Sequence, residues 1–355
     1  TAAVCSALLF GLPAASHAQP ADPAARESHH IDLDQFVVTA SPLARALGQT
    51  ISGVSVLRGG ELRERLEGSI GETLRLVPGI SITFFGPGAS RPIIRGLGGD
   101  RIRVLDDGLG SFDAAETSPD HAVPIEPALA QRIEIYRGPA SLLYGSSAAG
   151  GVVNTVTGRI PDIVPEDGFE GAVRYAHSTV NDGNEIAGGF NVAAGKLVFH
   201  GEGFFRDADD YDIPGLNASK KLLAEEAEEE GGAFDPNEEF TRGVVENTDL
   251  ETKGGAGGAS WIFDSSGYDG FVGFSVSGLD SNYGVPAGAH GHGHEEEEGH
   301  EDEHEGEEEE EIVRIDLKQV RYDFKSELNG DLGIFQQAKV RLGIGDYRHF
   351  ELEGD

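Results

Sequence analysis

The chain has 355 residues, of which 62 are acidic and 27 are basic, giving a formal net charge of −35. A chain of this length can hold two domains and bury a sizeable core. The acidic excess argues against nucleic acid or anionic lipid headgroups as the main partner.

An apolar segment, Ala2–Leu12, lies at the start of the chain and contains its one cysteine, Cys5. It is too short for a transmembrane helix but suits the apolar region of a secretory signal. Small residues at Ser16 and Ala18 form a cleavage site, so we predict a signal peptide over residues 1–18; an ordinary apolar terminus is the alternative. Because the sequence has no Met, we expect this signal to be incomplete. Cleavage would leave no cysteine, which excludes disulfides and thiolate metal sites.

Residues 19–48 are predicted to form a flexible N-terminal region, because they begin with a polar, Pro- and Ala-rich stretch. This region contains a short β-prone segment made of Asp34, Gln35, Phe36, Val37, Val38, Thr39 and Ala40. Such a segment on a flexible tether is suited to adding a strand to the sheet edge of a partner. The alternative is an ordinary edge strand of the domain that follows.

The region 49–165 has the pattern of one α/β domain. Capping-box spacing between Ser69 and Glu72 predicts a short helix that Pro78-Gly79 would end. Residues 132–136 alternate between polar and apolar, which is typical of a half-buried strand. The chain contains no G-x-S-x-G elbow and no dinucleotide fingerprint, so we predict that the protein is not an enzyme.

Three separated motifs in this domain carry a resemblance to a known family. They are Pro92-Ile93-Ile94-Arg95-Gly96, Arg103-Val104-Leu105-Asp106-Asp107-Gly108 and the stretch Arg132–Thr157. In this order they resemble the plug domain of TonB-dependent outer-membrane receptors. The resemblance implies that residues 34–40 are the TonB box, through which such receptors contact the energy-transducing protein TonB.

From residue 168 to residue 355 the chain shows alternating segments separated by turns, the pattern of membrane β-strands. In one of them Leu197 and Phe199 share a face, and His200 and Glu202 share the other. The resemblance implies a barrel of about 22 strands, and about seven of them lie in this chain. The expected fold class is therefore an α/β plug domain inside an antiparallel transmembrane β-barrel, in the N-terminal portion of a longer protein.

Counting strands from a periplasmic plug assigns the connections to sides of the membrane. The predicted periplasmic turns lie near Gly195, at Asp264–Gly267 and at Asn329–Asp331. Long extracellular loops are predicted at about 209–246 and 283–311, which is the usual asymmetry of such barrels. The apolar pattern of Val313–Phe324 changes phase between Leu317 and Val320, which predicts a bulge or the point where the strand leaves the bilayer.

Both long loops are acidic. Residues 209–246 contain twelve acidic and three basic residues, and His290–Glu311 contains thirteen acidic and no basic residues, so together they supply −22 of the net charge. The second loop also contains His290, His292, His294, His300 and His304. Imidazole and carboxylate suit Zn²⁺ and neighbouring divalent ions. We therefore predict a metal-contacting loop, with a solvated low-complexity loop as the alternative.

A second candidate metal site lies in the plug-like domain at Asp120 and His121. The context from Glu116 to Pro124 resembles the zinc-uptake branch of the family, in which an Asp-His pair contributes zinc ligands. The resemblance implies that role for Asp120 and His121, and barrel loops would supply the remaining ligands. The alternative is a cap or turn pair without a ligand.

These predictions describe an outer-membrane receptor that captures zinc at the cell surface and imports it to the periplasm. Its expected partners are TonB, Zn²⁺ as cargo and outer-membrane lipid, and it is expected to be monomeric and to lack a catalytic cofactor. The alternatives are a receptor of this class for haem, a ferric chelate or another divalent metal, and a surface metal-sequestering protein without transport. The acidic loops would repel an anionic ferric chelate, but His can ligate haem. Ligand type alone does not separate zinc from nickel, copper or manganese.

Overall fold

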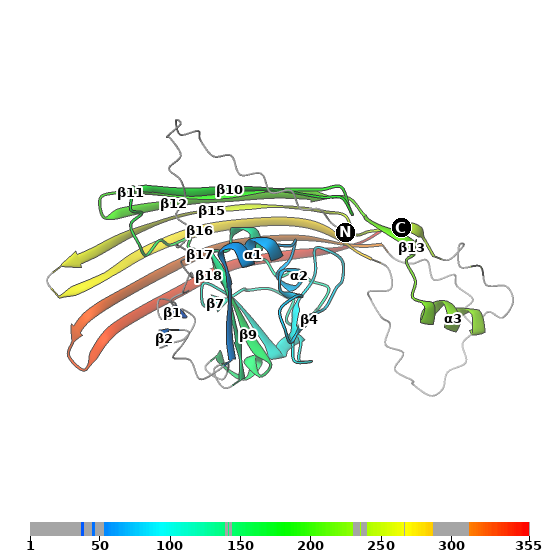
Figure 1. The fold of residues 1–355 in the computed structure, drawn as a ribbon, viewed down its shortest axis with the longest axis horizontal. Coiled ribbons are helices and arrows are strands. Elements are labelled where there is room, and N and C mark those ends of the chain that lie inside the picture. The colour runs from blue at the N-terminus through cyan, green and yellow to red at the C-terminus, as the bar shows by residue number, and fades with distance from the viewer. Residues whose placement is uncertain are drawn as a thin grey trace, which may run out of the picture.

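The structure is a computed structural model with two parts, a compact domain and a curved β-sheet that lies over it (Figure 1). It describes residues 37–38, 45–46, 53–138, 141, 144–229, 235, 240–265, 267–286 and 312–354. The predicted signal peptide, residues 1–18, lies outside these ranges. Of the predicted TonB box only β1 (Val37–Val38) is described, and it pairs antiparallel with β2 (Arg45–Ala46).

The compact domain, called the plug domain below, is built on a five-stranded mixed sheet. In spatial order its strands are β3 (Gly53–Arg58), β8 (Arg132–Arg137), β9 (Gly151–Val156), β6 (Ile102–Asp106) and β7 (Leu109–Gly110). A separate hairpin joins β4 (Ile80–Ile82) and β5 (Pro92–Ile94). The helical elements are α1 (Gly59–Arg65), α2 (Ile70–Leu74), η3 (Gly99–Arg101), η4 (Pro127–Leu129) and η6 (Ser146–Ala148). Among the described strands of this domain, only β6 and β9 pair in parallel.

Helix α2 begins as its capping pattern predicts, because the Oγ of Ser69 accepts a hydrogen bond from the backbone N–H of Glu72 at 3.4 Å. The helix ends at Leu74, four residues before the predicted stop at Pro78. The N–H of Arg75 bonds to the carbonyl of Glu72 at 3.2 Å, which is the tighter last turn common at helix ends.

The prediction that residues 132–136 form a half-buried strand is wrong, because Glu134 and Tyr136 are buried as well as the isoleucines between them. The carboxylate of Glu134 accepts hydrogen bonds from Arg132 Nε at 2.9 Å, Tyr136 Oη at 2.8 Å and Asn154 Nδ2 at 3.0 Å. These partners offset the cost of removing the carboxylate from water. The face of β8 that carries Glu134 and Tyr136 can therefore be buried within the plug domain.

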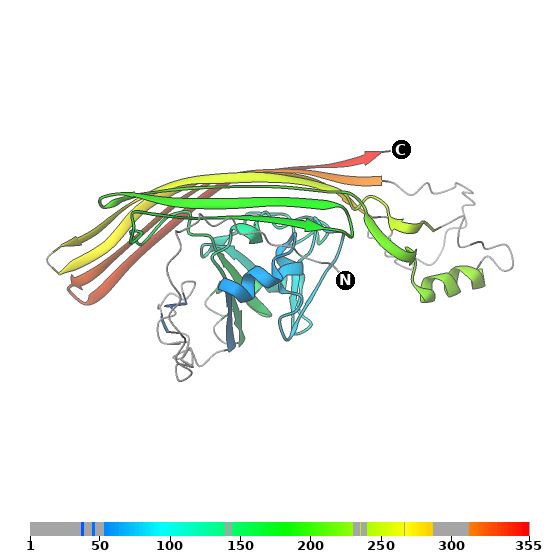
Figure 2. The same cartoon turned by 45° about the horizontal axis from the view of Figure 1, so that its top comes forward.

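The curved sheet has seven antiparallel strands that follow the order of the chain. They are β10 (Phe169–Ser178), β11 (Gly183–Ala194), β12 (Leu197–Ala208), β15 (Leu250–Ser265), β16 (Tyr268–Val285), β17 (Ile312–Leu332) and β18 (Phe335–Gly354). The plug domain lies against the concave face (Figure 2). Alternation along the strands is confirmed: on β12 Leu197 and Phe199 are exposed, whereas Val198 between them is buried. The face away from the plug domain thus carries large apolar side chains.

The connection predicted as a loop at about 209–246 contains secondary structure. A hairpin of β13 (Tyr211–Leu216) and β14 (Arg242–Val245) encloses α3 (Lys220–Glu229). These elements extend beyond the end of the sheet opposite the tight turns (Figure 1). Within the described part of the chain, no helix has the length and apolar character needed to cross a membrane.

Strand β17 pairs with β16 without a register shift, so the bulge predicted between Leu317 and Val320 is wrong. Ile315 and Leu317 belong to a core shared with the plug domain, whereas Val320 is exposed on the outer face. The apolar residues change face along the strand because its inner face near one end packs against the plug domain.

The third tight turn also differs from its prediction at Asn329–Asp331. Strand β17 continues to Leu332, and the turn to β18 lies at Gly333-Ile334. Gly333 has a φ of +79°, a conformation that favours glycine in tight hairpin turns. The pairing is irregular between Asn329 and Leu332, which moves the turn along the chain.

Candidate metal site

A tight turn carries Asp120 and His121 at the end of the sheet where the long connections lie. The backbone N–H of His121 donates to the carbonyl of Ser118 at 3.1 Å, with Pro119 in the second position of the turn. Proline favours this position because its ring fixes φ near the value that the turn requires. Asp120 and His121 are both buried, with exposed fractions of 6% and 4%.

The two side chains contact each other. Asp120 Oδ1 lies 3.1 Å from His121 Nδ1 and accepts a hydrogen bond from Ser118 Oγ at 2.6 Å. Burial tends to raise the pKa of Asp120, but the hydrogen bonds from Ser118 and His121 hold that pKa below its ordinary value. The carboxylate is therefore ionised at neutral pH.

The second ring nitrogen of His121, Nε2, is buried and has no hydrogen-bond partner among the described residues. In the tautomer in which Nδ1 donates to Asp120, this nitrogen carries a lone pair. A carboxylate that orients a histidine in this way is a common feature of zinc sites. The pair therefore has the chemistry of a metal ligand together with the group that orients it.

Tyr283, near the end of β16, holds the backbone of this turn. Its hydroxyl accepts a hydrogen bond from the N–H of Ala122 at 2.7 Å and donates one to the carbonyl of Asp120 at 3.3 Å. Its ring lies against Gly88, where an added Cβ would come within 2.6 Å of a ring carbon. A plug loop and a strand of the sheet thus position His121 together.

His349, on β18, contacts the same site. Its ring lies edge-on to the ring of His121, with the centroids 4.5 Å apart and an interplanar angle of 80°. Tyr347 lies two residues earlier on this strand, and its ring centroid is 5.5 Å from that of His349. Among the described residues, no group of three His, Cys, Asp or Glu side chains is arranged to hold a metal ion.

Below this site, buried arginines join the plug domain to the sheet. Arg206 on β12 donates to Glu126 at 2.8 Å, to the carbonyl of Gly68 at 2.9 Å and to Glu185 on β11 at 2.8 Å. Arg159 bonds to Glu202 on the sheet at 2.7 Å. Their carboxylate partners are already neutralised and do not form a second candidate cation site.

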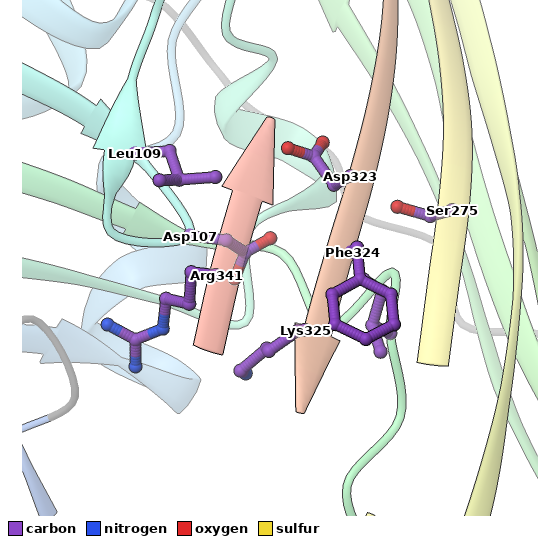
Figure 3. Close-up of a pocket in the computed structure, with 8 residues that line it drawn as sticks. Asp107, Leu109, Ser275, Asp323, Phe324, Lys325 and Arg341 are labelled. Carbon is purple, nitrogen blue, oxygen red and sulfur yellow. The ribbon is translucent and has the colours of Figure 1, made fainter. Parts of the chain in front are cut away.

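A small pocket between the plug domain and the sheet mixes charges of both signs (Figure 3). Asp107 of the plug domain and Asp323 of β17 line it together with Lys325 of β17 and Arg341 of β18. The Nζ of Lys325 also lies 5.5 Å from the ring centroid of Phe271. Two cations beside two carboxylates make this pocket a poor site for a metal cation.

The structure thus brings Asp120 and His121 together and adds two residues that the sequence analysis did not name, Tyr283 and His349. The alternation along β18 offers a signal for His349, because residue 349 has the same parity as Arg341, which lines the pocket between the sheet and the plug domain. The predicted ligands His290, His292, His294, His300 and His304 lie outside the described residues.

Comparison with known proteins identifies the plug domain. Residues 46–152 match the family described as the TonB-dependent Receptor Plug Domain. The "Hemin receptor" of Yersinia pestis is 30% identical over 177 residues, which are 50% of this chain and 26% of that protein. The "Vitamin B12 transporter BtuB" of Vibrio vulnificus (strain CMCP6) is 32% identical over 126 residues, 35% of this chain and 20% of that protein. The chain thus spans about a quarter or less of these relatives.

Solved structures share the fold. "Copper transporter OprC" superposes with a TM-score of 0.59 and 14% identity, over 84% of this chain and 37% of that chain. "The FrpB iron transporter from Neisseria meningitidis (F3-3 variant)" has a TM-score of 0.56 and 11% identity, over 84% and 41% of the two chains. The fold class, an α/β plug domain with an antiparallel transmembrane β-barrel, is confirmed, and so is the location in the bacterial outer membrane.

Proposed function

We propose that this chain, which carries the plug domain of a TonB-dependent receptor and strands of its outer-membrane barrel, belongs to a receptor that captures zinc and imports it. The observation that carries the proposal is the buried Nε2 of His121, which lacks a described partner while Asp120 holds Nδ1. Zn²⁺ binds neutral imidazole and carboxylate well. The site lies at the end of the sheet with the long connections, which is the extracellular end in our strand count.

The charge of the long connections supports a cation as cargo. Residues 209–246 and 290–311 carry a net charge of −22, which would raise the local concentration of cations and lower that of anionic chelates. The five histidines of the second loop are suitable zinc ligands by residue type, beside the carboxylates of the same loop. In this proposal the loops gather zinc and the plug site selects it.

Energy for import would come from TonB, through strand addition at residues 34–40. In the structure Val37 and Val38 already form a short antiparallel pairing with Arg45 and Ala46. A two-residue pairing is marginal by itself, so a partner's sheet can replace it or extend it at the other edge of β1. Backbone hydrogen bonds would provide this contact whichever side chains the segment carries.

The test is the double substitution Asp120→Ala with His121→Ala in the full-length protein, in a background without residues 290–311. We expect the apparent Kd for Zn²⁺ to rise more than about 100-fold and zinc uptake to stop, because both the ligand and the group that orients it are lost. Surface expression and barrel insertion should be unchanged. His177→Ala, an exposed histidine on β10, is the matched control. Unchanged zinc binding and uptake in the double variant would rule out the proposed site.

A haem receptor is the second candidate, because a relative at 30% identity is named as a hemin receptor. The free nitrogen of His121 could ligate haem iron. A haem titration of the purified protein, followed by absorbance, distinguishes the two candidates. Under the zinc proposal, haem neither binds at His121 nor competes with Zn²⁺; competition that is lost in His121→Ala would favour haem.

A further inference from the structure

The barrel wall presents a second imidazole to the candidate site. On β18 the odd-numbered positions face the plug domain: Cβ atoms at Gly343 and Gly345 would lie 3.5 and 3.3 Å from the ring of Phe112. His349 continues this parity and pairs with Leu317, which is buried in the core shared with the plug domain. The backbone of β18 therefore aims His349 at the plug loop.

The ring of His121 is not satisfied by the residues around it. One nitrogen contacts Asp120 at 3.1 Å, and the other is buried without a described partner in a residue that is 4% exposed. A buried polar atom without a partner is costly, and such atoms often mark an ion or ligand site. The ring of His349, a titratable group of the barrel, contacts the ring of His121, with 4.5 Å between the centroids.

We propose that His349 is a ligand of the metal bound by His121, so that one imidazole comes from the plug loop and one from the barrel wall. This inference rests on the proposed zinc site. Two imidazoles beside a carboxylate favour Zn²⁺ and its neighbours Cu²⁺ and Ni²⁺ over Mg²⁺ and Ca²⁺, which prefer oxygen ligands.

In this proposal, His349 rotates about its side-chain bonds to bring its nitrogen to the metal beside His121. The two rings are now edge to face, so their nitrogens do not point at one position, and three donors do not converge among the described residues. His349 is exposed, whereas Tyr283 and the core around it restrain His121. His349 is therefore the member of the pair that can move to the metal.

A metal held in this way links the plug loop to the barrel. Ligands on two parts of the molecule make metal binding depend on the relative position of those parts, because bond lengths of about 2.0–2.1 Å tolerate little displacement. Movement of the plug domain away from β18 would separate the two imidazoles. The ion would then lose one ligand, and its affinity would fall at the moment of release.

The experiment compares His349→Ala, His121→Ala and the control His177→Ala in the full-length protein without residues 290–311. Co²⁺ is the probe, since its visible absorption reports ligand type and coordination number, and Zn²⁺ competition gives affinity. We expect His349→Ala to raise the Kd for Zn²⁺ at least about tenfold and to change the Co²⁺ spectrum. His349→Cys should restore binding and add a thiolate charge-transfer band, which a purely structural role would not produce.

The outcomes distinguish the role of His349 from the existence of the zinc site at His121. Parental affinity and Co²⁺ spectrum in His349→Ala, with binding lost in His121→Ala, would overturn the role of His349 and leave the proposed zinc site intact. A parent protein that binds neither Zn²⁺ nor Co²⁺ in this background would overturn both. Heat-modifiable migration on gels, measured for every variant, identifies those that retain the folded barrel.

Discussion

The hydroxyl of Tyr283 accepts a hydrogen bond from the backbone N–H of Ala122 at 2.7 Å, joining residues 161 positions apart. The same hydroxyl donates to the carbonyl of Asp120 at 3.3 Å, so one barrel side chain holds the backbone on both sides of His121. The turn has hydrogen bonds of its own, such as that from the N–H of His121 to the carbonyl of Ser118, and the contact from the barrel fixes its position against β16. The metal site is therefore a property of the two parts docked together.

Tyr283→Phe tests this dependence. The substitution leaves the N–H of Ala122 buried without a partner, which costs about 1–3 kcal/mol, and we expect the turn to shift and zinc affinity to fall while the barrel still inserts. Tyr268→Phe is the matched control, because this tyrosine lies at the other end of β16, where its hydroxyl donates to the carbonyl of Asp331 at 3.0 Å. Equal zinc affinity in the two variants, measured by competition titration, would show that Tyr283 does not position the site.

The pH dependence of plug stability should contain a contribution from Glu72. Burial, followed by the nearby charge of Glu67, raises the pKa of Glu72 to about 7. The unfolded chain releases this proton near its ordinary pKa, so between about pH 4.5 and 7 the folded state binds more protons than the unfolded state. Stability from this group is therefore present at low pH and is lost as pH rises through 7.

Glu72→Gln should remove that dependence and stabilise the plug domain above pH 7. Each unit of pKa shift corresponds to about 1.4 kcal/mol, so the urea midpoint for plug unfolding should rise at pH 8 and change little at pH 4.5. Glu61→Gln, on the exposed face of α1, is the control. Protease susceptibility of the plug domain in urea provides the measurement, and a midpoint at pH 8 that matches the parent would contradict the assignment.

Much of the barrel could be predicted because lipid and lumen impose opposite demands on alternate residues. This rule placed Leu197 and Phe199 on one face of their strand, and both are exposed in the structure. It failed where the inner face packs against protein. Leu317 is apolar on the inner face because the plug domain lies there, and this change of packing partner is the reason for the phase change that we interpreted as a bulge or as the point where the strand leaves the bilayer.

The candidate site could be predicted only in part for a similar reason. Asp120 and His121 are adjacent in sequence, and a resemblance to known receptors pointed to them. Tyr283 and His349 contact this turn only when the sheet and the plug domain are packed together. The local sequence around each residue does not indicate which distant residues will be its neighbours. The burial of Glu134 could not be predicted for the same reason. A charged side chain can be buried there because Asn154, on a different strand, donates a hydrogen bond to it.

The acidic loop at 290–311 should affect capture more than transport. Replacing it with a neutral Gly/Ser linker of equal length should slow initial zinc uptake at scarce metal and leave uptake at abundant metal nearly intact, because its field raises local cation concentration. The difference should shrink with added salt, since the Debye length is about 10 Å at 0.1 M. A third protein, in which Asn replaces the five histidines and the carboxylates are kept, distinguishes metal binding by the histidines from the electrostatic effect of the acidic residues. Uptake kinetics with radioactive zinc measure all three proteins.

Coupling to TonB should depend on the backbone of Val37. Val37→Pro removes a backbone donor and restricts φ, so strand addition should fail. We expect zinc uptake to stop while zinc binding at the cell surface persists. Val38→Ala keeps every backbone donor and serves as the control. Parental uptake in Val37→Pro, at equal expression, would contradict the assignment of residues 34–40.

Docking of the plug domain should depend on Arg206. This buried guanidinium bonds to Glu126 and Gly68 of the plug domain and to Glu185 of the neighbouring strand. Arg206→Gln would leave the buried carboxylate of Glu126 without its charged partner, a change that typically costs about 3–5 kcal/mol, whereas Glu185 keeps its pair with Arg174. We expect the plug domain to unfold at lower urea concentration while the barrel keeps its strands, and the barrel to leak small antibiotics into the cell. Arg348→Gln removes an exposed pair with Asp346, which solvent screens, so this control should change neither measurement. A parental urea midpoint in Arg206→Gln would mean that the shared apolar core around Leu317 holds the two parts together without this arginine.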